Sequence, residues 1–388
     1  MRSFIFILTL MSFAYSQTPP IEPGVSQELA KWRAARYSDV RYKLDLTLEK
    51  MSPVLKGTME IRVSVRDVSV PPAVAGGSTP IILDWRRIRG FEDRSTISNV
   101  SINGASVQSA SFSSSGAVEE RPKARALNYE ESNEHLIFRD GVVLGENFIK
   151  LDFTSPILPS GSAITRYVDK EDGSEYIYSL FVPSDASTAF PVFDQPDLKA
   201  TFDLEVDVPK DWNVVGNEMK MLASPIIGYS AHEDYERPPI PPDFVRYKFC
   251  NSRKPINTYV FAFAAGPWQQ VSEPRAVATG SPVSIKTIRG NPVATALGSD
   301  LPSHVFVRKS QLAKFQPHAA EVFRLNREAV KYFEQYFDYK FPFPKYDLVL
   351  IPEFPFGGME HAGATFLRES SIIFPQEPTK NDMASRAT

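Results

Sequence analysis

The sequence predicts a mainly β protein, in which an antiparallel β saddle or sandwich is followed by the first part of an α+β domain. Up to about residue 270, short runs of alternating apolar and polar residues recur between turn-forming segments, as in antiparallel sheets. Beyond that point apolar residues recur at three and four residues, the period of a helix. The 32 prolines in 388 residues exceed the average usage of about 5% and also favour strands and loops.

The first part of the chain begins with a short helix, which we expect over residues 26–36 with Ser26 as its N-cap. Its buried side should carry Leu29, Trp32 and Arg33. Strands are expected where alternating or short apolar runs occur, at residues 40–48, 61–65, 81–85, 100–102, 134–138, 148–153, 176–182, 201–208 and 259–266. Segments rich in Pro, Gly or Ser predict loops at residues 71–80, 109–116 and 221–243.

The second part should contain a strand at residues 283–287, a loop at 290–302 and an amphipathic helix that opens at Pro317. The side of this helix expected to pack into a core carries Val322, Leu325, Ala329, Phe333 and Tyr336. The change of period places a domain boundary near residue 270. We therefore expect a β domain over residues 17–270 and a second, α+β segment over residues 271–388.

Residues 1–16 have the pattern of a signal peptide. Arg2 is followed by an apolar run of about ten residues and by Ala14-Tyr15-Ser16, a small-x-small cleavage site. The run is too short to cross a bilayer of about 30 Å as a helix, which argues against an uncleaved anchor. We expect an exported protein, secreted or periplasmic, with no transmembrane segment after cleavage.

Charge and cysteine content exclude some classes of function. The formal net charge is −3, and Arg86-Arg87-Ile88-Arg89 is the tightest basic cluster, better explained as a solvated strand end than as a nucleic-acid contact. Cys250 is the single cysteine, so no intrachain disulfide can form. We expect it to be a small buried apolar residue.

The stretch at residues 354–363, FPFGGMEHAG, follows an apolar run at 346–351 that predicts a buried strand. Its glycines lack Cβ atoms, so another backbone can approach closely, and an extended edge of this kind can pair with a peptide by strand addition. Glu360 would then bind a positively charged amine at the end of that peptide. The alternative is a turn that carries a surface glutamate.

Two stretches carry a resemblance to a known family. FGGMEH at residues 356–361 resembles the G-x-M-E-N exopeptidase motif, and FPVFDQPDLKATF at 190–202 resembles the signature F-P-C-F-D-E-P-x-x-K-A-x-F. Both motifs are typical of the aminopeptidase N family of zinc metallopeptidases, and they occur in the expected order. The sequence departs from the two motifs at Val192, Gln195 and His361, where the family usually has Cys, Glu and Asn.

The resemblance implies a substrate-binding site at Gly357, Gly358, Met359 and Glu360, at the start of a thermolysin-like catalytic domain. In that family the backbone of the glycine pair contacts the bound peptide, and the glutamate recognises its free α-amine. Many members use a second Glu or Gln for the amine, and its position here falls on Val182, which cannot accept a hydrogen bond. Asp185 could replace it, or a loop insertion could have shifted the position.

The family's zinc ligands come from an H-E-x-x-H helix and a downstream Glu. The five histidines are too scattered for this motif, because no two lie four residues apart: His135, His232, His304, His318 and His361. We therefore predict no metal ligand and no catalytic residue in this chain, which should be inactive alone although the complete family enzyme holds Zn²⁺. A separately encoded C-terminal half would be one partner, and a peptide with a free N-terminus the other.

Two other functions remain open on the sequence. An exported β domain could bind peptide ends or a protein partner without catalysis. A carbohydrate-binding sandwich would need exposed tryptophans as stacking platforms, and the chain has four of them: Trp32, Trp85, Trp212 and Trp268. Their positions in patterned segments favour core roles instead.

Overall fold

The computed structural model describes residues 18–66, 79–109, 127–222, 239–249, 254–273, 303–374 and 377–387. Several expectations lie outside these residues: the signal peptide at 1–16, Cys250, His232, the strand at 283–287 and the loop at 290–302. The loops at 71–80, 109–116 and 221–243 lie largely outside them as well. Among the described residues, no helix is both long and apolar enough to span a membrane.

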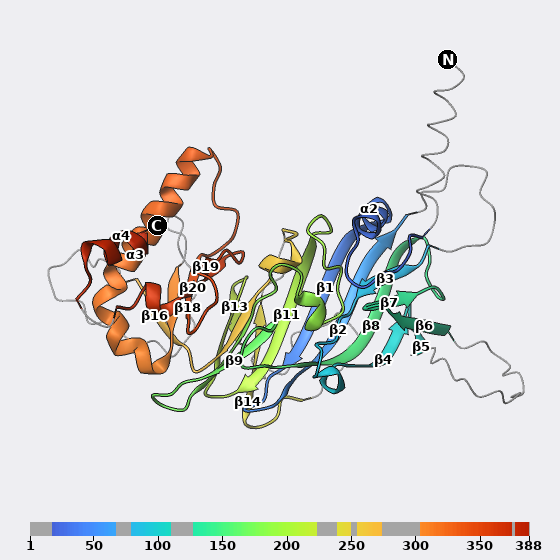
Figure 1. Cartoon of the computed structure of the whole chain (residues 1–388), viewed down its shortest axis with the longest axis horizontal. Helices are drawn as coiled ribbons and strands as arrows, with labels where there is room; N and C mark the ends of the chain where they lie inside the picture. The colour runs from blue at the N-terminus through green and yellow to red at the C-terminus, as the bar shows by residue number, and fades with distance from the viewer. Residues whose placement is uncertain are drawn as a thin grey trace, which may run out of the picture.

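The predicted fold class is confirmed: strands are the main regular structure of the described chain, and they form three sheets (Figure 1). An eleven-stranded sheet has the order β13-β14-β11-β1-β2-β8-β4-β5-β6-β7-β3. Its strands are β1 Tyr37–Thr47, β2 Val54–Val65, β3 Ile81–Asp84, β4 Thr96–Ile102, β5 Ala105–Ser109, β6 Leu127–Ser132, β7 His135–Phe138, β8 Gly145–Pro156, β11 Ala200–Pro209, β13 Lys220–Leu222 and β14 Phe244–Phe249. Most neighbours are antiparallel, but β1 pairs with β11 and β5 with β6 in parallel.

Two smaller sheets complete the strand content. The four-stranded sheet, in the order β12-β15-β10-β9, contains β9 Ile164–Val168, β10 Glu175–Ser179, β12 Asn213–Gly216 and β15 Phe263–Gly266. The five-stranded sheet, in the order β16-β17-β18-β20-β19, contains β16 Gln269–Ser272, β17 His304–Val307, β18 Asp347–Ile351, β19 Gly358–Met359 and β20 Ala364–Arg368. Three α-helices are described, namely α2 Gln27–Arg36, α3 Leu312–Tyr336 and α4 Lys380–Ala387. Short 3-10 turns are η1 Glu92–Arg94, η2 Ala186–Thr188, η3 Thr258–Val260, η4 Lys309–Gln311 and η5 Glu369–Ser371.

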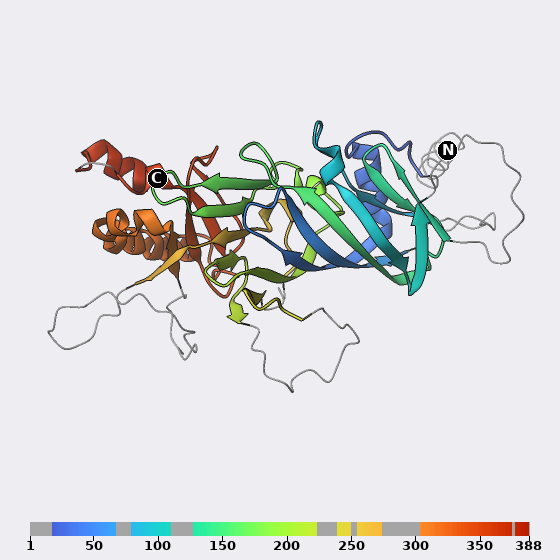
Figure 2. The same cartoon turned by 90° about the horizontal axis from the view of Figure 1, so that it is seen from below.

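Period-two alternation explains how these layers pack. In β10, Ile177 points into the core shared with the large sheet, whereas Tyr176 and Tyr178 point into a core shared with the five-stranded sheet. In β18, Val349 faces this second core while Leu348 faces a third core beneath α3. The order of layers is therefore large sheet, four-stranded sheet, five-stranded sheet and α3. Helix α2 lies at the opposite end of the molecule from α3 and α4 (Figures 1 and 2).

The N-terminal helix and the first strands agree with expectation. Ser26 caps α2 by accepting a hydrogen bond from the Leu29 N–H at 3.1 Å, and the helix buries the three predicted residues Leu29, Trp32 and Arg33. The strand expected at 259–266 is shorter, because residues 258–260 form the 3-10 turn η3 and β15 begins at Phe263. The boundary near residue 270 stays a prediction, and β16 at that point pairs with β17.

The prediction for the second helix is correct for Val322, which is buried, and wrong for the first residue of the helix and for its aromatic side chains. Helix α3 begins at Leu312 and contains Pro317, and its buried residues are Phe315, Ala319, Val322 and Phe323. The aromatic residues expected in the core are exposed, Phe333 by 53% and Tyr336 by 69%. Length explains the difference: a helix of 25 residues extends for about 38 Å, whereas a five-residue strand covers only about 17 Å. The second half of α3 therefore projects beyond the sheet.

Candidate substrate-binding edge

The four predicted substrate-binding residues lie together at the edge of the five-stranded sheet. Strand β18 ends at Ile351, and the chain returns as the two-residue strand β19, which pairs with β20 through Gly358↔Leu367 and Met359↔Phe366. Strand β19 is the last in the sheet order, so its outer side has no strand neighbour among the described residues. An exposed edge of this kind can accept an extended peptide.

The two glycines occupy different environments. A Cβ atom on Gly358 would lie 2.9 Å from Cδ2 of Leu367, so a larger residue at this position would displace the end of the Leu367 side chain. A Cβ on Gly357 would meet nothing within 4 Å. Gly357 accepts a hydrogen bond from the Arg368 N–H at 2.9 Å through its carbonyl. The backbone of Gly357 is therefore fixed by a hydrogen bond, while the space that a side chain would fill at this position is empty.

Arg368 fixes the loop before the glycines. Its guanidinium donates hydrogen bonds to three successive carbonyls, those of Phe354 at 3.0 Å, Pro355 at 3.0 Å and Phe356 at 3.1 Å. Sequence reasoning missed this role, because no local motif indicates which groups an arginine at the end of a strand will bind.

Met359 is buried, whereas the neighbouring Glu360 is exposed and charged. Met359 packs into the core between the two smaller sheets, with Phe354 and Phe366 among its neighbours there. Glu360 is exposed, and its carboxylate forms no hydrogen bond or ion pair within the part of the chain that is described. The next residue turns the chain back, since the His361 N–H donates to the Met359 carbonyl at 3.0 Å. This arrangement presents one carboxylate beside an open strand edge.

His361, which replaces the family's Asn, is buried in an apolar site. Its exposed fraction is 1%, and its ring packs edge-on against Phe366 at 4.4 Å between centroids. Neither ring nitrogen has a hydrogen-bond partner among the described residues. Burial lowers the pKa of His361 to about 3, so the imidazole is neutral near pH 7.

The described residues do not fit a zinc site. The other three described histidines are engaged apart from one another: His135 lies 3.1 Å from Asp84, His304 lies 3.0 Å from Asp347, and His318 lies 3.1 Å from Arg386. No group of three or more His, Cys, Asp or Glu side chains in the described ranges could hold a metal ion. A catalytic zinc needs three protein ligands.

The second amine-binding residue is not supplied at the predicted position. Val182 is partly buried against the core that contains Met359, and its apolar side chain cannot accept a hydrogen bond from an amine. Asp185, the alternative carboxylate, forms an ion pair with Arg86. That guanidinium already neutralises the charge that a substrate amine would need.

The signature at residues 190–202 has a structural role. The Phe193 N–H donates to the Tyr42 hydroxyl at 2.9 Å, and the Asp194 N–H donates to the Asp84 carboxylate at 2.7 Å. Asp84 is itself bound by Arg33 of α2, at 2.6 and 2.9 Å. Burial raises the pKa of Asp194 to about 6. The signature thus joins α2 and β3 to β11.

Gln195, which replaces the family's Glu, also contacts α2. Its side-chain amide donates to the Ala30 carbonyl at 3.1 Å, and its oxygen accepts from Arg33 at 3.4 Å. A neutral side chain therefore fits this buried position beside an arginine that Asp84 already pairs.

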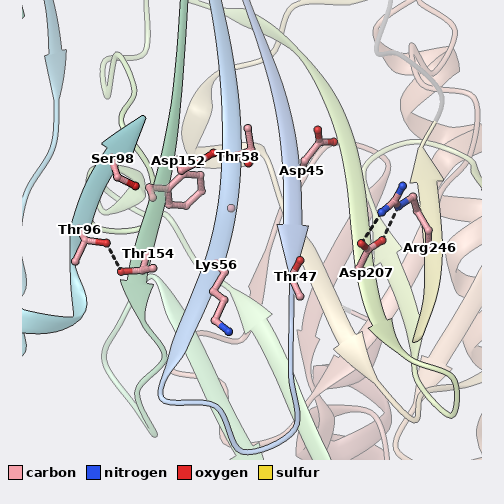
Figure 3. Close-up of a pocket in the computed structure, with 12 residues that line it drawn as sticks. Asp45, Thr47, Lys56, Thr58, Thr96, Ser98, Asp152, Thr154, Asp207 and Arg246 are labelled. Carbon is pink, nitrogen blue, oxygen red and sulfur yellow. Dashed lines mark hydrogen bonds and ion pairs between the residues drawn. The ribbon is translucent and has the colours of Figure 1, made fainter. Parts of the chain in front are cut away.

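A polar hollow of about 290 Å³ lies elsewhere, on the large sheet (Figure 3). The side chains that line it hydrogen bond to one another across strands: Thr58 donates to Asp152 at 2.7 Å, Thr96 and Thr154 share a hydrogen bond at 2.8 Å, and Arg246 binds Asp207 at 2.7 Å. None of the predicted substrate-binding residues lines it. This mutual pairing is typical of a solvated sheet face.

The tryptophans exclude a carbohydrate site built on exposed indole rings. All four are buried: Trp32, Trp85, Trp212 and Trp268. None can act as an exposed stacking platform.

The strand edge and the signature at residues 190–202 both lie in segments that match models of one protein family. Residues 87–227 match the family model of the Peptidase M1 N-terminal domain, and residues 322–388 match that of the Peptidase family M1 domain. Among similar proteins is aminopeptidase N of Streptomyces lividans, 29% identical over 253 residues, or 64% of this chain and 25% of the relative.

Two further relatives have lower identity. Aminopeptidase M1 of Arabidopsis thaliana is 25% identical over 283 residues, covering 72% of this chain and 27% of the relative. Glutamyl aminopeptidase of Homo sapiens is 25% identical over 226 residues, covering 58% of this chain and 19% of the relative. The chain thus spans about a quarter of the length of the first relatives that it matches. The two matched segments together make up more than half of the chain, which therefore belongs to peptidase family M1 and carries its N-terminal domain and the start of its catalytic domain.

Proposed function

We propose that residues 354–363 are the substrate edge of an exported, zinc-dependent aminopeptidase, and that they hold the free N-terminus of a peptide. The observation that carries the proposal is the exposed Glu360 carboxylate directly after the open edge strand β19. The names of the relatives, which are aminopeptidases, support the same reaction class.

Recognition would combine two kinds of contact. Backbone groups of Gly358 would pair with the extended peptide, which requires no particular side chain on the substrate. Gly357, whose carbonyl accepts from Arg368 within the sheet, would leave room for the peptide because it has no side chain. Glu360 would accept a charge-assisted hydrogen bond from the α-ammonium. A peptide with an acetylated N-terminus has no such charge, so Glu360 would distinguish free from blocked peptides.

Hydrolysis requires residues beyond those described. The family's zinc would be held by ligands that this part of the chain does not supply, in a longer form of the protein or in a separately encoded C-terminal half. The described residues would then contribute binding and orientation of the substrate. Export rests on residues 1–16, and N-terminal sequencing of the secreted protein should find Gln17 first.

Binding of tetra-alanine to the full chain tests the amine recognition. We expect the free-amine peptide to bind about threefold more tightly than N-acetyl-tetra-alanine, because an exposed ion pair contributes at most about 1 kcal/mol. Glu360→Gln should abolish this preference. Glu353→Gln is the matched control, since Glu353 is another exposed carboxylate seven residues earlier, in the segment between β18 and β19, and it should leave the preference unchanged. Equal preference in wild type and Glu360→Gln would refute the proposal.

The second candidate function, a non-catalytic binding module, predicts the same preference. The two functions differ once a C-terminal half with H-E-x-x-H is supplied. An aminopeptidase would then hydrolyse Ala-p-nitroanilide, whereas a binding module would not.

A further inference from the structure

A buried asparagine at the end of the four-stranded sheet hydrogen bonds the backbone just after Glu360. Asn217 directly follows β12 and is 6% exposed. Its amide nitrogen donates to the Ala362 carbonyl at 2.8 Å and to the Val260 carbonyl at 2.9 Å. Its amide oxygen accepts from the Ala262 N–H at 2.8 Å. Both hydrogens and the oxygen of the amide are thus used.

Ala362, two residues beyond Glu360, is held on both sides of its peptide unit. Its carbonyl accepts from Asn217, and its N–H donates to the Val260 carbonyl at 3.2 Å. Val260 in η3 therefore binds both Asn217 and Ala362. Because Met359 on the other side of Glu360 is paired with Phe366, the backbone of Glu360 is anchored at both ends.

Gly363 adds a steric component to the same contact. It has a φ of +69°, and a Cβ at this position would lie 2.6 Å from the backbone oxygen of Asn217. The Gly363 carbonyl also accepts from Nζ of buried Lys345 at 2.9 Å, and Lys345 donates to the Gly216 carbonyl at 2.8 Å. The chain after Glu360 therefore packs closely against the end of β12.

We propose that Asn217 is a positioning residue for Glu360, so that the four-stranded sheet sets where the substrate amine is recognised; this rests on the proposed function of Glu360. Asn217 touches no substrate. It fixes the peptide unit of Ala362, and a backbone held in this way sets the direction of the Cα–Cβ bond of Glu360 relative to β19, which limits the region that the carboxylate can reach.

Position 217 requires a side chain that both donates and accepts hydrogen bonds. Aspartate has the same shape and can still accept from the Ala262 N–H, but it has no N–H to give to the two carbonyls. Asn217→Asp would place a carboxylate against the Ala362 and Val260 carbonyls, and the segment at residues 360–363 would move away. Gly363→Ala disturbs the same contact from the other side.

The test compares four variants of the full chain in two measurements. The first is the ratio of affinities for free-amine and N-acetyl tetra-alanine, and the second is hydrogen exchange of the amides at residues 359–363. The variants are Asn217→Asp, Gly363→Ala, Glu360→Gln and a matched control, Asn147→Asp. Asn147 is also a buried asparagine that donates to two carbonyls, those of Val143 at 2.7 Å and Gly145 at 3.0 Å, but on the large sheet.

We expect Asn217→Asp and Gly363→Ala to reduce the affinity ratio about threefold, as Glu360→Gln does, and to speed exchange at residues 359–363. Asn147→Asp should change neither measurement even if it lowers the melting temperature.

If Glu360→Gln reduces the ratio but Asn217→Asp and Gly363→Ala do not, the positioning role is wrong and the proposed function survives. Unchanged exchange in Asn217→Asp also overturns it. If Asn217→Asp does not fold, the affinity ratio and the hydrogen exchange of Gly363→Ala decide whether the positioning role is correct. If Glu360→Gln itself leaves the ratio unchanged, the proposed function fails and the positioning role with it.

Discussion

Arg308 and Asp169 form an ion pair, 2.6 Å between Nη1 and Oδ2, that joins the end of β17 to the turn after β9. The same guanidinium binds Glu369 in η5 at 2.5 and 2.8 Å. All three groups are shielded from solvent, and the Lys309 N–H nearby donates to the Tyr176 hydroxyl at 2.9 Å. One arginine therefore connects the four-stranded sheet, the five-stranded sheet and the segment after β20.

We expect Arg308→Met to destabilise the protein strongly. Removal of the cation leaves the Asp169 and Glu369 carboxylates without their arginine in a shielded site, which costs roughly 3 kcal/mol in the free energy of unfolding, the low end for a broken buried pair. Urea denaturation followed by circular dichroism measures the loss. Arg41→Met is the control, because its ion pair with Asp39 is exposed and should contribute less than about 1 kcal/mol. Equal effects of the two substitutions would contradict this account.

The domain boundary near residue 270 predicts the course of limited proteolysis. We expect a protected core that ends near residues 268–280. Because Tyr178 and Ala264 share a core with Phe366 and Val349, the two fragments should stay associated after cleavage and elute together on size exclusion. A C-terminal fragment more resistant than the N-terminal one would show that the boundary is wrong.

Burial of His361 predicts acid sensitivity. Its pKa is lowered to about 3 in the folded protein, whereas an unfolded histidine titrates near 6.5, so unfolding takes up a proton between these values. The stability contributed by the neutral imidazole is complete above about pH 6.5 and is lost as the pH falls toward 3. One proton corresponds to about 1.4 kcal/mol per pH unit, or about 3 kcal/mol between pH 6.5 and 4.

His361→Asn, which restores the family's usual residue, should lose less stability than wild type over this range. Denaturant titrations at several pH values measure both proteins. Parallel pH profiles for the two would show that His361 does not titrate in this way.

Sequence patterns predicted many of the strands and the open strand edge at residues 357–360 because these features depend on local order. Alternation placed Leu44, Leu46 and Leu48 on a buried face, and all three are fully buried. The glycine pair followed by a glutamate predicted an open edge with a carboxylate, and β19 with Glu360 is such an edge.

Other features could not be predicted, because they depend on residues far apart in the sequence. The run at Tyr176–Tyr178 is buried on both faces, but alternation alone does not tell which sheet covers which face. The contact of Asn217 with Ala362 spans 145 residues, and no local motif marks it. The periodicity of α3 predicted an apolar side but contained no information on where the sheet beneath it ends.

The spacing of the five histidines, no two of which lie four residues apart, predicts weak metal binding. The purified 17–388 fragment should bind zinc no better than roughly micromolar and should release no p-nitroaniline from Ala- or Leu-p-nitroanilide, because a catalytic zinc needs three protein ligands. Stoichiometric zinc together with chelator-sensitive hydrolysis would mean an unrecognised ligand set. His304, His318 and His361 would then be the first residues to substitute.

Chemical-shift mapping tests the central claim most directly, namely that the edge at Gly357–Glu360 recognises the free N-terminus of a peptide. The isotope-labelled chain is titrated with tetra-alanine and, separately, with N-acetyl-tetra-alanine. We predict that the free-amine peptide shifts the amide resonances of Gly357, Gly358, Met359 and Glu360, and that the acetylated peptide shifts the Glu360 resonance much less. Shifts confined to other surfaces, such as the polar hollow around Thr58 and Asp152, or equal Glu360 shifts with both peptides, would contradict the claim.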